Sequence, residues 1–211
     1  MRGRCLGGRV ASTVPAVQLS FFGAGERPAE VTDLAGLLCG PGQIVRSGVG
    51  ARLGVVLGVP ADRPSWRADA ILATFSDCGL GGERVATVDD LAAVRTEFRP
   101  ELAGLAAEWI RGAMKVPPRG FALSGSQLRL WAMAAGHRDD YGYLLTLGES
   151  DETGWTAIGA ALSAAGLTAA LMGPRAGGPA YRITSRRRLA RLAELAGDPP
   201  PGATESDWPC G

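Results

Sequence analysis

The sequence predicts an α+β protein built from two copies of one unit, in which β-hairpins alternate with helices. Four landmarks recur in the same order about 90 residues apart, which indicates an internal duplication. Apolar residues alternate with period two in some short segments and follow a helical period in others. Turns rich in Gly, Pro and Asp separate these segments.

The repeat is visible as matched segments. LGVVLG at Leu53–Gly58 resembles YLLTLG at Tyr143–Gly148, and each is followed by a polar turn and then a tryptophan, Trp66 or Trp155. Each tryptophan opens an Ala-rich stretch that ends in Gly-Leu, so we expect both indoles to anchor the core. The last landmark, L-A-x-L-A, occurs at Leu102–Ala106 and Leu189–Ala193.

The same order of elements is expected in both copies. In the first copy we expect strands at Ile44–Val49 and Leu53–Leu57, a helix at Ser65–Ser76, strands at Arg84–Val88 and Val94–Phe98, and a helix at Pro100–Ile110. In the second copy we expect strands at Leu128–Ala135 and Tyr141–Leu147 around a Gly-His-Arg-Asp-Asp turn, a helix at Thr153–Ala165, a hairpin of Ala169–Met172 with Ala180–Thr184, and a helix at Leu189–Ala196.

The chain divides accordingly into an N-terminal arm (1–30), a first repeat (31–112), a linker (113–118), a second repeat (119–198) and a Pro-rich tail (199–211). The apolar run Val10–Phe22 is interrupted by polar residues and Pro, and we interpret it as a leader strand or a disordered arm rather than a signal peptide. The tail is expected to be disordered or to lie on the surface, with Trp208 as a candidate anchor.

Composition narrows the functional classes. The 211 residues carry a net charge of +1, so the chain as a whole lacks the basic excess of a typical nucleic-acid binder, although a local basic face remains open. The four cysteines are widely spaced, which disfavours structural zinc, and the single histidine, His137, disfavours a Ser-His-acid triad. No apolar run has the length of a membrane span, and we expect a cytoplasmic protein. Abundant Ala, Gly and Arg, with Lys115 the sole lysine, is a composition typical of a GC-rich, actinobacterial-like genome.

The segment before the first expected strand reads LAGLLCGPG at Leu34–Gly42. It resembles the signature of the LAGLIDADG homing-endonuclease family, with which it shares L-A-G-L and the final Gly. The resemblance implies a duplicated αββαββα fold over roughly 31–198, in which the two signature helices pack together through small residues. It also implies two curved antiparallel sheets that lie along DNA.

The same resemblance implies that the metal-binding acids are missing. In the family, an acid before the final Gly of each signature helix holds the divalent cations that cut DNA. That position is Pro41 in the first copy and, if the second signature is Arg119–Ser126, Gly125 in the second. The other acidic position of the signature is taken by Cys39 and Leu123. We therefore expect no cofactor, no catalytic residue and a resemblance to members that kept the scaffold without cleavage, such as a sporulation-regulator branch.

If the sheets still bind DNA, their outward side chains are the candidates. Period two places Arg52, Arg129 and Arg182 on the faces opposite the core, with Arg46 from a neighbouring strand and His137, Arg138 and Arg175 at hairpin tips. His137 is equally interpretable as an ordinary turn residue, and the arginines as solvated strand residues.

Two alternatives stay open at this stage. Trp131 and Met133 on the same expected face as Arg129 favour a protein-interaction scaffold that has lost DNA binding, unless a one-residue shift of register buries Trp131. Asp139, Asp140 and the Glu149–Asp151 segment are the candidate ligands if the chain is an endonuclease with non-standard metal ligands.

Overall fold

A computed structural model describes residues 28–210, and it confirms the predicted duplicated αββαββα fold. The expected N-terminal arm before residue 28, including the apolar run Val10–Phe22, lies outside the described residues.

The first repeat begins with a 3-10 turn, η1 (Val31–Leu34), that runs into helix α1 (Ala35–Cys39). Its remaining elements are β1 (Gln43–Ser47), β2 (Gly50–Pro60), α2 (Trp66–Asp77), β3 (Gly82–Ala86), β4 (Leu91–Thr96), η2 (Pro100–Leu102) and α3 (Ala103–Trp109). The strands form one antiparallel sheet in the order β1-β2-β4-β3. Two short strands, β5 (Ile110–Arg111) and β6 (Met114–Lys115), follow α3 as a separate hairpin.

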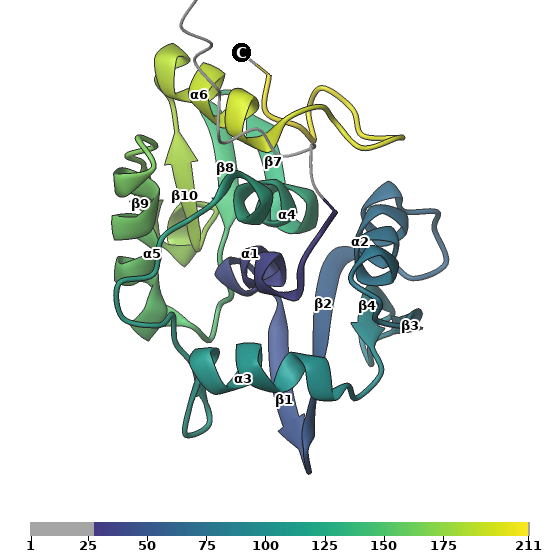
Figure 1. Cartoon of the computed structure of the whole chain (residues 1–211). Coiled ribbons are helices and arrows are strands. Elements are labelled where there is room, and N and C mark those ends of the chain that lie inside the picture. The colour runs from purple at the N-terminus through teal and green to yellow at the C-terminus, as the bar shows by residue number, and fades with distance from the viewer. Residues whose placement is uncertain (1–27, 211) are drawn as a thin grey trace, which may run out of the picture.

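The second repeat has the same order. It contains α4 (Gly125–Ala135), β7 (Gly136–Asp139), β8 (Gly142–Thr146), α5 (Glu152–Ala164), β9 (Ala170–Met172), η3 (Pro174–Ala176), β10 (Ala180–Ile183) and α6 (Arg186–Ala196). Its sheet has the order β7-β8-β10-β9, which matches the first sheet strand for strand. Figure 1 shows α1 and α4 side by side at the centre of the molecule, with one sheet on each side of them.

The contact between the two central helices depends on Gly36. A Cβ atom built on Gly36 would lie 2.0 Å from the carbonyl oxygen of Gln127 in α4, a distance that no real side chain tolerates. The two helix backbones can therefore approach this closely only because residue 36 is a glycine, which has no Cβ atom. Large side chains complete the core around this contact: Leu34, Leu37, Leu128 and Trp131 each have 0% of their surface exposed.

One sequence prediction was wrong in a way that matters for the site. The segment Leu128–Ala135 is not a strand but most of helix α4, and the following residues, predicted as a turn, form strand β7. Ser124 and Gln127 form a capping box that begins the helix: the Ser124 hydroxyl accepts from the Gln127 N–H, and the Gln127 side chain accepts from the Ser124 N–H. The helix is buried on nearly all sides, so the sequence lacks the one-sided apolar period of a surface helix.

This correction changes three further predictions. Trp131 and Met133 do not form an exposed patch, since their exposed fractions are 0% and 4%. Arg129 lies on helix α4 and not on a sheet. The expected second signature at Arg119–Ser126 covers a turn and only the first residues of α4, so it is not the helix that packs on α1.

Other elements lie within a few residues of their predicted positions. Strands β3 and β4 begin two and three residues earlier than predicted, and α5 and α6 lie within a few residues of their expected places. Trp155 is buried as expected, whereas Trp66 is only half-buried and donates its indole N–H to Asp207. Trp208 in the tail is 2% exposed and donates to the carbonyl of Gly197, so this residue does hold the tail against the body.

Candidate functional site

The C-terminal ends of the two central helices open into one cavity of 650 Å³. Pro41 follows α1, and Ala134, Ala135 and Gly136 end α4. Strands of both sheets complete the walls, with Gln43 and Val56 from the first and His137 and Thr146 from the second. Both repeats therefore line this cavity, which lies at the C-terminal ends of the two central helices.

A buried lysine holds the end of α1. The Nζ atom of Lys115 lies 2.8 Å from the carbonyl oxygen of Gly40 and 2.6 Å from that of Gly42, and donates a hydrogen bond to each. The same ammonium is 2.8 Å from Oδ2 of Asp151, and the two side chains are 5% and 7% exposed. Gly40 is the C-cap of α1 and Gly42 lies two residues beyond it. A cation at the C-terminal end of a helix is favourable both as a hydrogen-bond donor and as a positive charge.

Burial lowers the pKa of Lys115, while the hydrogen bond and charge of Asp151 act in the opposite direction. Gln43 also donates to Asp151 through Nε2, at 3.3 Å. The carboxylate is thus shared between one cation and one amide, as a buried charge requires.

An arginine does the same for α4. Arg67, from helix α2 of the first repeat, donates through Nη1 to the carbonyls of Ala132 and Met133 at 3.1 and 2.6 Å, and through Nη2 to that of Gly136 at 2.6 Å. Its counter-ion is Asp207 of the tail, at 3.2 Å. Each central helix therefore ends on a protein cation that is itself paired with an aspartate.

The residues present do not fit a divalent metal at these helix ends. Magnesium and calcium require oxygen ligands, preferably carboxylates. Pro41 after α1 and Ala135 with Gly136 at the end of α4 offer no side-chain oxygen, and Lys115 already takes the carbonyls of Gly40 and Gly42. Cys39 is 1% exposed, and burial raises the pKa of its thiol, which keeps it protonated.

The sequence-based choice of Gly125 as the second metal position was wrong. Gly125 is the first residue of α4, at the opposite end from the cavity, so it is not the counterpart of Pro41. The counterpart at the C-terminal end is the Ala135-Gly136 pair. Among residues 28–210, no cluster of three or more His, Cys, Asp or Glu side chains is placed to hold a metal ion.

The register of the first sheet puts Arg52 and Arg95 on its outward face, opposite the buried Leu53, Val55 and Val94. Arg95 pairs with Glu83 of β3 at 2.9 Å. Arg52 lies over the ring of Phe98, with 4.6 Å from its guanidinium carbon to the ring centroid.

In the second sheet, Arg182 and His137 lie on either side of the buried Leu144, on the face opposite Tyr181 and Leu145. Arg182 pairs with Asp139 and stacks on Tyr141, 5.3 Å from the ring centroid. His137 lines the cavity, and its pKa is lowered by burial and by the nearby charge of Arg67. Arg182 and Arg52 thus stand on the faces that the sequence predicts.

The other candidates lie elsewhere. Arg46 shares the helix-side face of β1 with the buried Ile44, because it pairs with the buried Ala51, so its predicted outward position was wrong. Arg138 points to the tail, where it donates to the carbonyl of Cys210. Arg175 is exposed in η3, at the tip of the β9–β10 hairpin where it was expected.

The Arg129 side chain contacts the C-terminal tail of the protein. Its Nη1 donates to the carbonyls of Ala196, at 2.8 Å, and Asp198, and its guanidinium lies 5.1 Å from the centroid of Trp208. It therefore ties α4 to the end of α6 and the tail.

Three charged residues of the site were missed from the sequence: Arg67, Lys115 and Asp207. Asp151 was named only as a candidate metal ligand, whereas it is the ion-pair partner of Lys115. One signal was present, since Lys115 is the only lysine in a chain whose other cations are arginines. Arg67 and Asp207 carry no local pattern, because each meets its partner across a large separation in sequence.

Comparison with known proteins gives one kind of match. No family model matches the chain, and no curated protein matches it. Among solved structures, the chain is similar to the homing endonuclease I-WcaI bound to its DNA recognition sequence, with a TM-score of 0.57 over 81% of this chain and 82% of that one. The fold is similar to that of this homing endonuclease. At 12% identity, this similarity concerns the fold alone. None of the described helices has the length and hydropathy needed to span a membrane.

Proposed function

We propose that this protein is a LAGLIDADG-type module that binds double-stranded DNA without cleaving it. The observation that carries the proposal concerns the two helix ends: Lys115 and Arg67 donate to the carbonyls there, and no acid directly follows either helix. A metal-dependent phosphodiesterase needs cations held by oxygen ligands at the reacting phosphate. The homing-endonuclease-like fold and the outward arginines support DNA as the partner.

The outward faces of the sheets supply the binding groups. Arg52, Arg95 and Arg182 can donate to phosphates or to base edges, and guanine is the base that an arginine fork matches best. Small neighbours such as Gly54 let a duplex approach the sheet closely. Glu83 and Asp139 offset two of the three arginine charges, so the affinity is expected to be modest and strongly dependent on salt.

The test is a fluorescence-anisotropy titration of labelled random duplex with the pure full chain at two salt concentrations. Arg52→Ala combined with Arg182→Ala removes one outward cation from each sheet. If both contact phosphates, the salt slope of log K falls by about 1.8. Arg191→Ala is the matched control, because Arg191 is an exposed cation on α6 that pairs with Glu194. Equal binding by the double variant and the control would remove the proposed interface.

A protein-interaction scaffold is the second candidate. One observation favours it: Val45 and Val56 lie on the same outward face as Arg52 and are 47% and 40% exposed. An apolar strip rimmed by paired charges is typical of a protein contact. Concentration-dependent self-association, with no binding to duplex at low salt, would support this function over the first.

An endonuclease with non-standard ligands is the least supported candidate. Asp139 and Asp151 are engaged by Arg182 and Lys115, and Glu149 is the acid that lines the central cavity. Magnesium-dependent nicking of a plasmid, abolished in Glu149→Gln, would revive it.

A further inference from the structure

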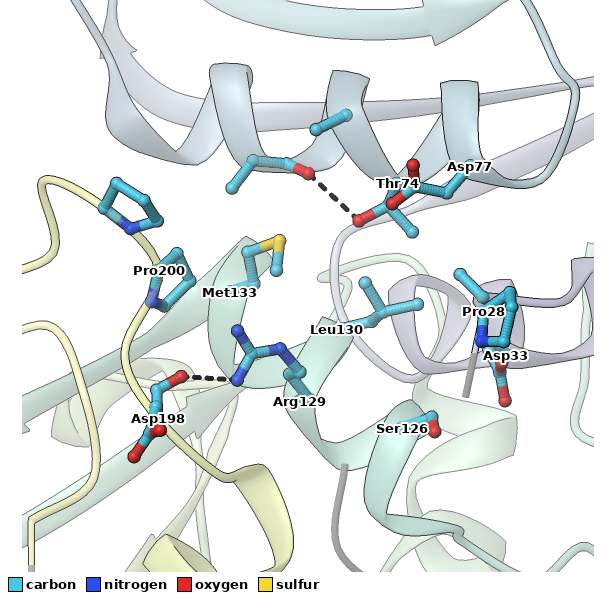
Figure 2. Close-up of a pocket in the computed structure, with 14 residues that line it drawn as sticks. Pro28, Asp33, Thr74, Asp77, Ser126, Arg129, Leu130, Met133, Asp198 and Pro200 are labelled. Atoms are coloured by element: carbon cyan, nitrogen blue, oxygen red, sulfur yellow. Dashed lines mark hydrogen bonds between the residues drawn. The ribbon is translucent and has the colours of Figure 1, made fainter. Parts of the chain in front are cut away.

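A second cavity lies on the molecule away from the central one, between α2, α4 and the segment that follows α6 (Figure 2). Its volume is 420 Å³, within the roughly 300–1,000 Å³ range of cavities that hold drug-sized ligands. Leu130 and Met133 of α4 form an apolar floor with the alanines of α2 and Pro200. The cavity is therefore large enough and apolar enough to take aromatic side chains.

The walls of this cavity are held in place by the contacts of Arg129. Its hydrogen bonds to Ala196 and Asp198 fix the segment after α6 against α4, and Figure 2 shows the bond to Asp198 beside Met133 and Pro200. The acids Asp77 and Asp198 are exposed at the rim. The rim thus favours an occupant that brings an apolar group together with a cation.

The chain itself carries such an occupant. Pro28 lines the cavity, so residues 1–27 reach the described part of the chain at its rim. Leu19, Phe21 and Phe22 are apolar, and Arg27 is a cation next to Pro28. Six residues in extended form span about 20 Å, which is enough for Phe22 to reach the floor. A covalent tether this short gives an effective concentration on the order of millimolar.

We propose that residues 19–27 dock in this cavity, with Phe21 and Phe22 against Leu130 and Met133 and with Arg27 beside the acidic rim. Aromatic rings pack well against a methionine sulfur, which favours Met133 as the contact. In this arrangement the N-terminal arm ties α2 of the first repeat to α4 of the second. The proposal is independent of DNA binding.

The first experiment uses limited proteolysis of the full chain with chymotrypsin, which cleaves after large apolar residues. Docking protects the bonds after Phe21 and Phe22. Ala73→Arg places a bulky cation at an exposed position that lines the cavity, and we expect it to speed cleavage at these bonds about tenfold. Ala157→Arg is the control, because Ala157 is equally exposed on a helix, α5, away from the cavity.

Equal cleavage rates in wild type and both variants would overturn the proposal. So would protection that depends on protein concentration, since that result places the arm in the cavity of a second copy.

A second experiment observes the cavity floor directly. Carbon-13 labelling of methionine methyls gives separate NMR signals for Met114, Met133 and Met172. Phe22→Ala is expected to move the Met133 signal and to leave Met114 and Met172 in place, because of these three methionines only Met133 lines the cavity. An unmoved Met133 signal would contradict docking even if the proteolysis result were positive.

Discussion

Replacing Lys115 by methionine removes the cation at the end of α1 while keeping an unbranched side chain of similar length. The change leaves the carboxylate of Asp151, whose side chain is 7% exposed, without its ion-pair partner. It also leaves the carbonyls of Gly40 and Gly42 without the donor that lies 2.8 and 2.6 Å away. Breaking a buried ion pair by removing one partner typically costs about 3–5 kcal/mol.

That cost sets the expected size of the effect. In a protein of 150–250 residues each kcal/mol lowers Tm by roughly 2–4 °C, so Lys115→Met is expected to lower Tm by about 6–20 °C. The control is Arg191→Met, because the exposed Arg191–Glu194 pair lies three residues apart on one helix and contributes about 0.5 kcal/mol or less.

The assay is urea unfolding of the full chain followed by tryptophan fluorescence, in a double-mutant cycle with Asp151→Leu. The double variant should be more stable than Lys115→Met, because it no longer buries an unpaired charge. Two results would refute the reasoning: a destabilisation no larger than that of the Arg191 control, or additive effects of the two substitutions.

Three further predictions follow from the same structure. Gly36→Ala should destabilise the protein strongly or prevent folding, because the new Cβ would lie 2.0 Å from the Gln127 carbonyl oxygen. In the control Gly104→Ala, in α3, the new Cβ has no atom within 4 Å, so this variant should be neutral or stabilised by up to ~1 kcal/mol. Thermal unfolding compares the two variants. Arg67→Ala should lower the unfolding free energy by about 3 kcal/mol, since it leaves three buried carbonyls without a charged donor; a loss below that of an exposed arginine would contradict the capping role. The pKa of His137 is lowered in the folded state, so the unfolded state binds the proton first as the pH falls. The free energy of unfolding should therefore fall as the pH drops below 6.5, and His137→Asn should remove this dependence. NMR of the single histidine measures its pKa directly.

The duplication and most of the element order could be predicted from sequence. The strand at Leu53 and the helices after Trp66 and Trp155 show clear periods, because each has one buried and one more exposed side. In such elements the spacing of apolar residues in the sequence shows which side is buried.

Helix α4 could not be identified in that way. A helix in the centre of the molecule is apolar on nearly every side, and a short apolar run of this kind does not differ from a buried strand by period alone. The capping box of Ser124 and Gln127 was the remaining local signal for a helix start. Because this helix was misread, Arg129 and Gly125 were placed at the wrong points of the fold.

The charged residues at the helix ends could not be predicted from any local sequence pattern. Lys115 reaches Gly40 across 75 positions of the chain, and Arg67 reaches Gly136 across 69. Only tertiary packing brings these groups together: Arg67 comes from α2, which packs on α4, and Lys115 comes from β6. Neither residue belongs to the segment that it caps. Outward arginines such as Arg52 and Arg182, by contrast, follow from strand period once the strand itself is correct.

The most direct test of the central claim is one gel of supercoiled plasmid incubated with the full chain and magnesium at low salt, loaded with and without removal of the protein. We expect a retarded plasmid that returns to the supercoiled position once the protein is removed. Nicked or linear plasmid that forms only with magnesium would contradict the claim that protein cations have replaced metal at the helix ends, and an unretarded plasmid would contradict DNA binding.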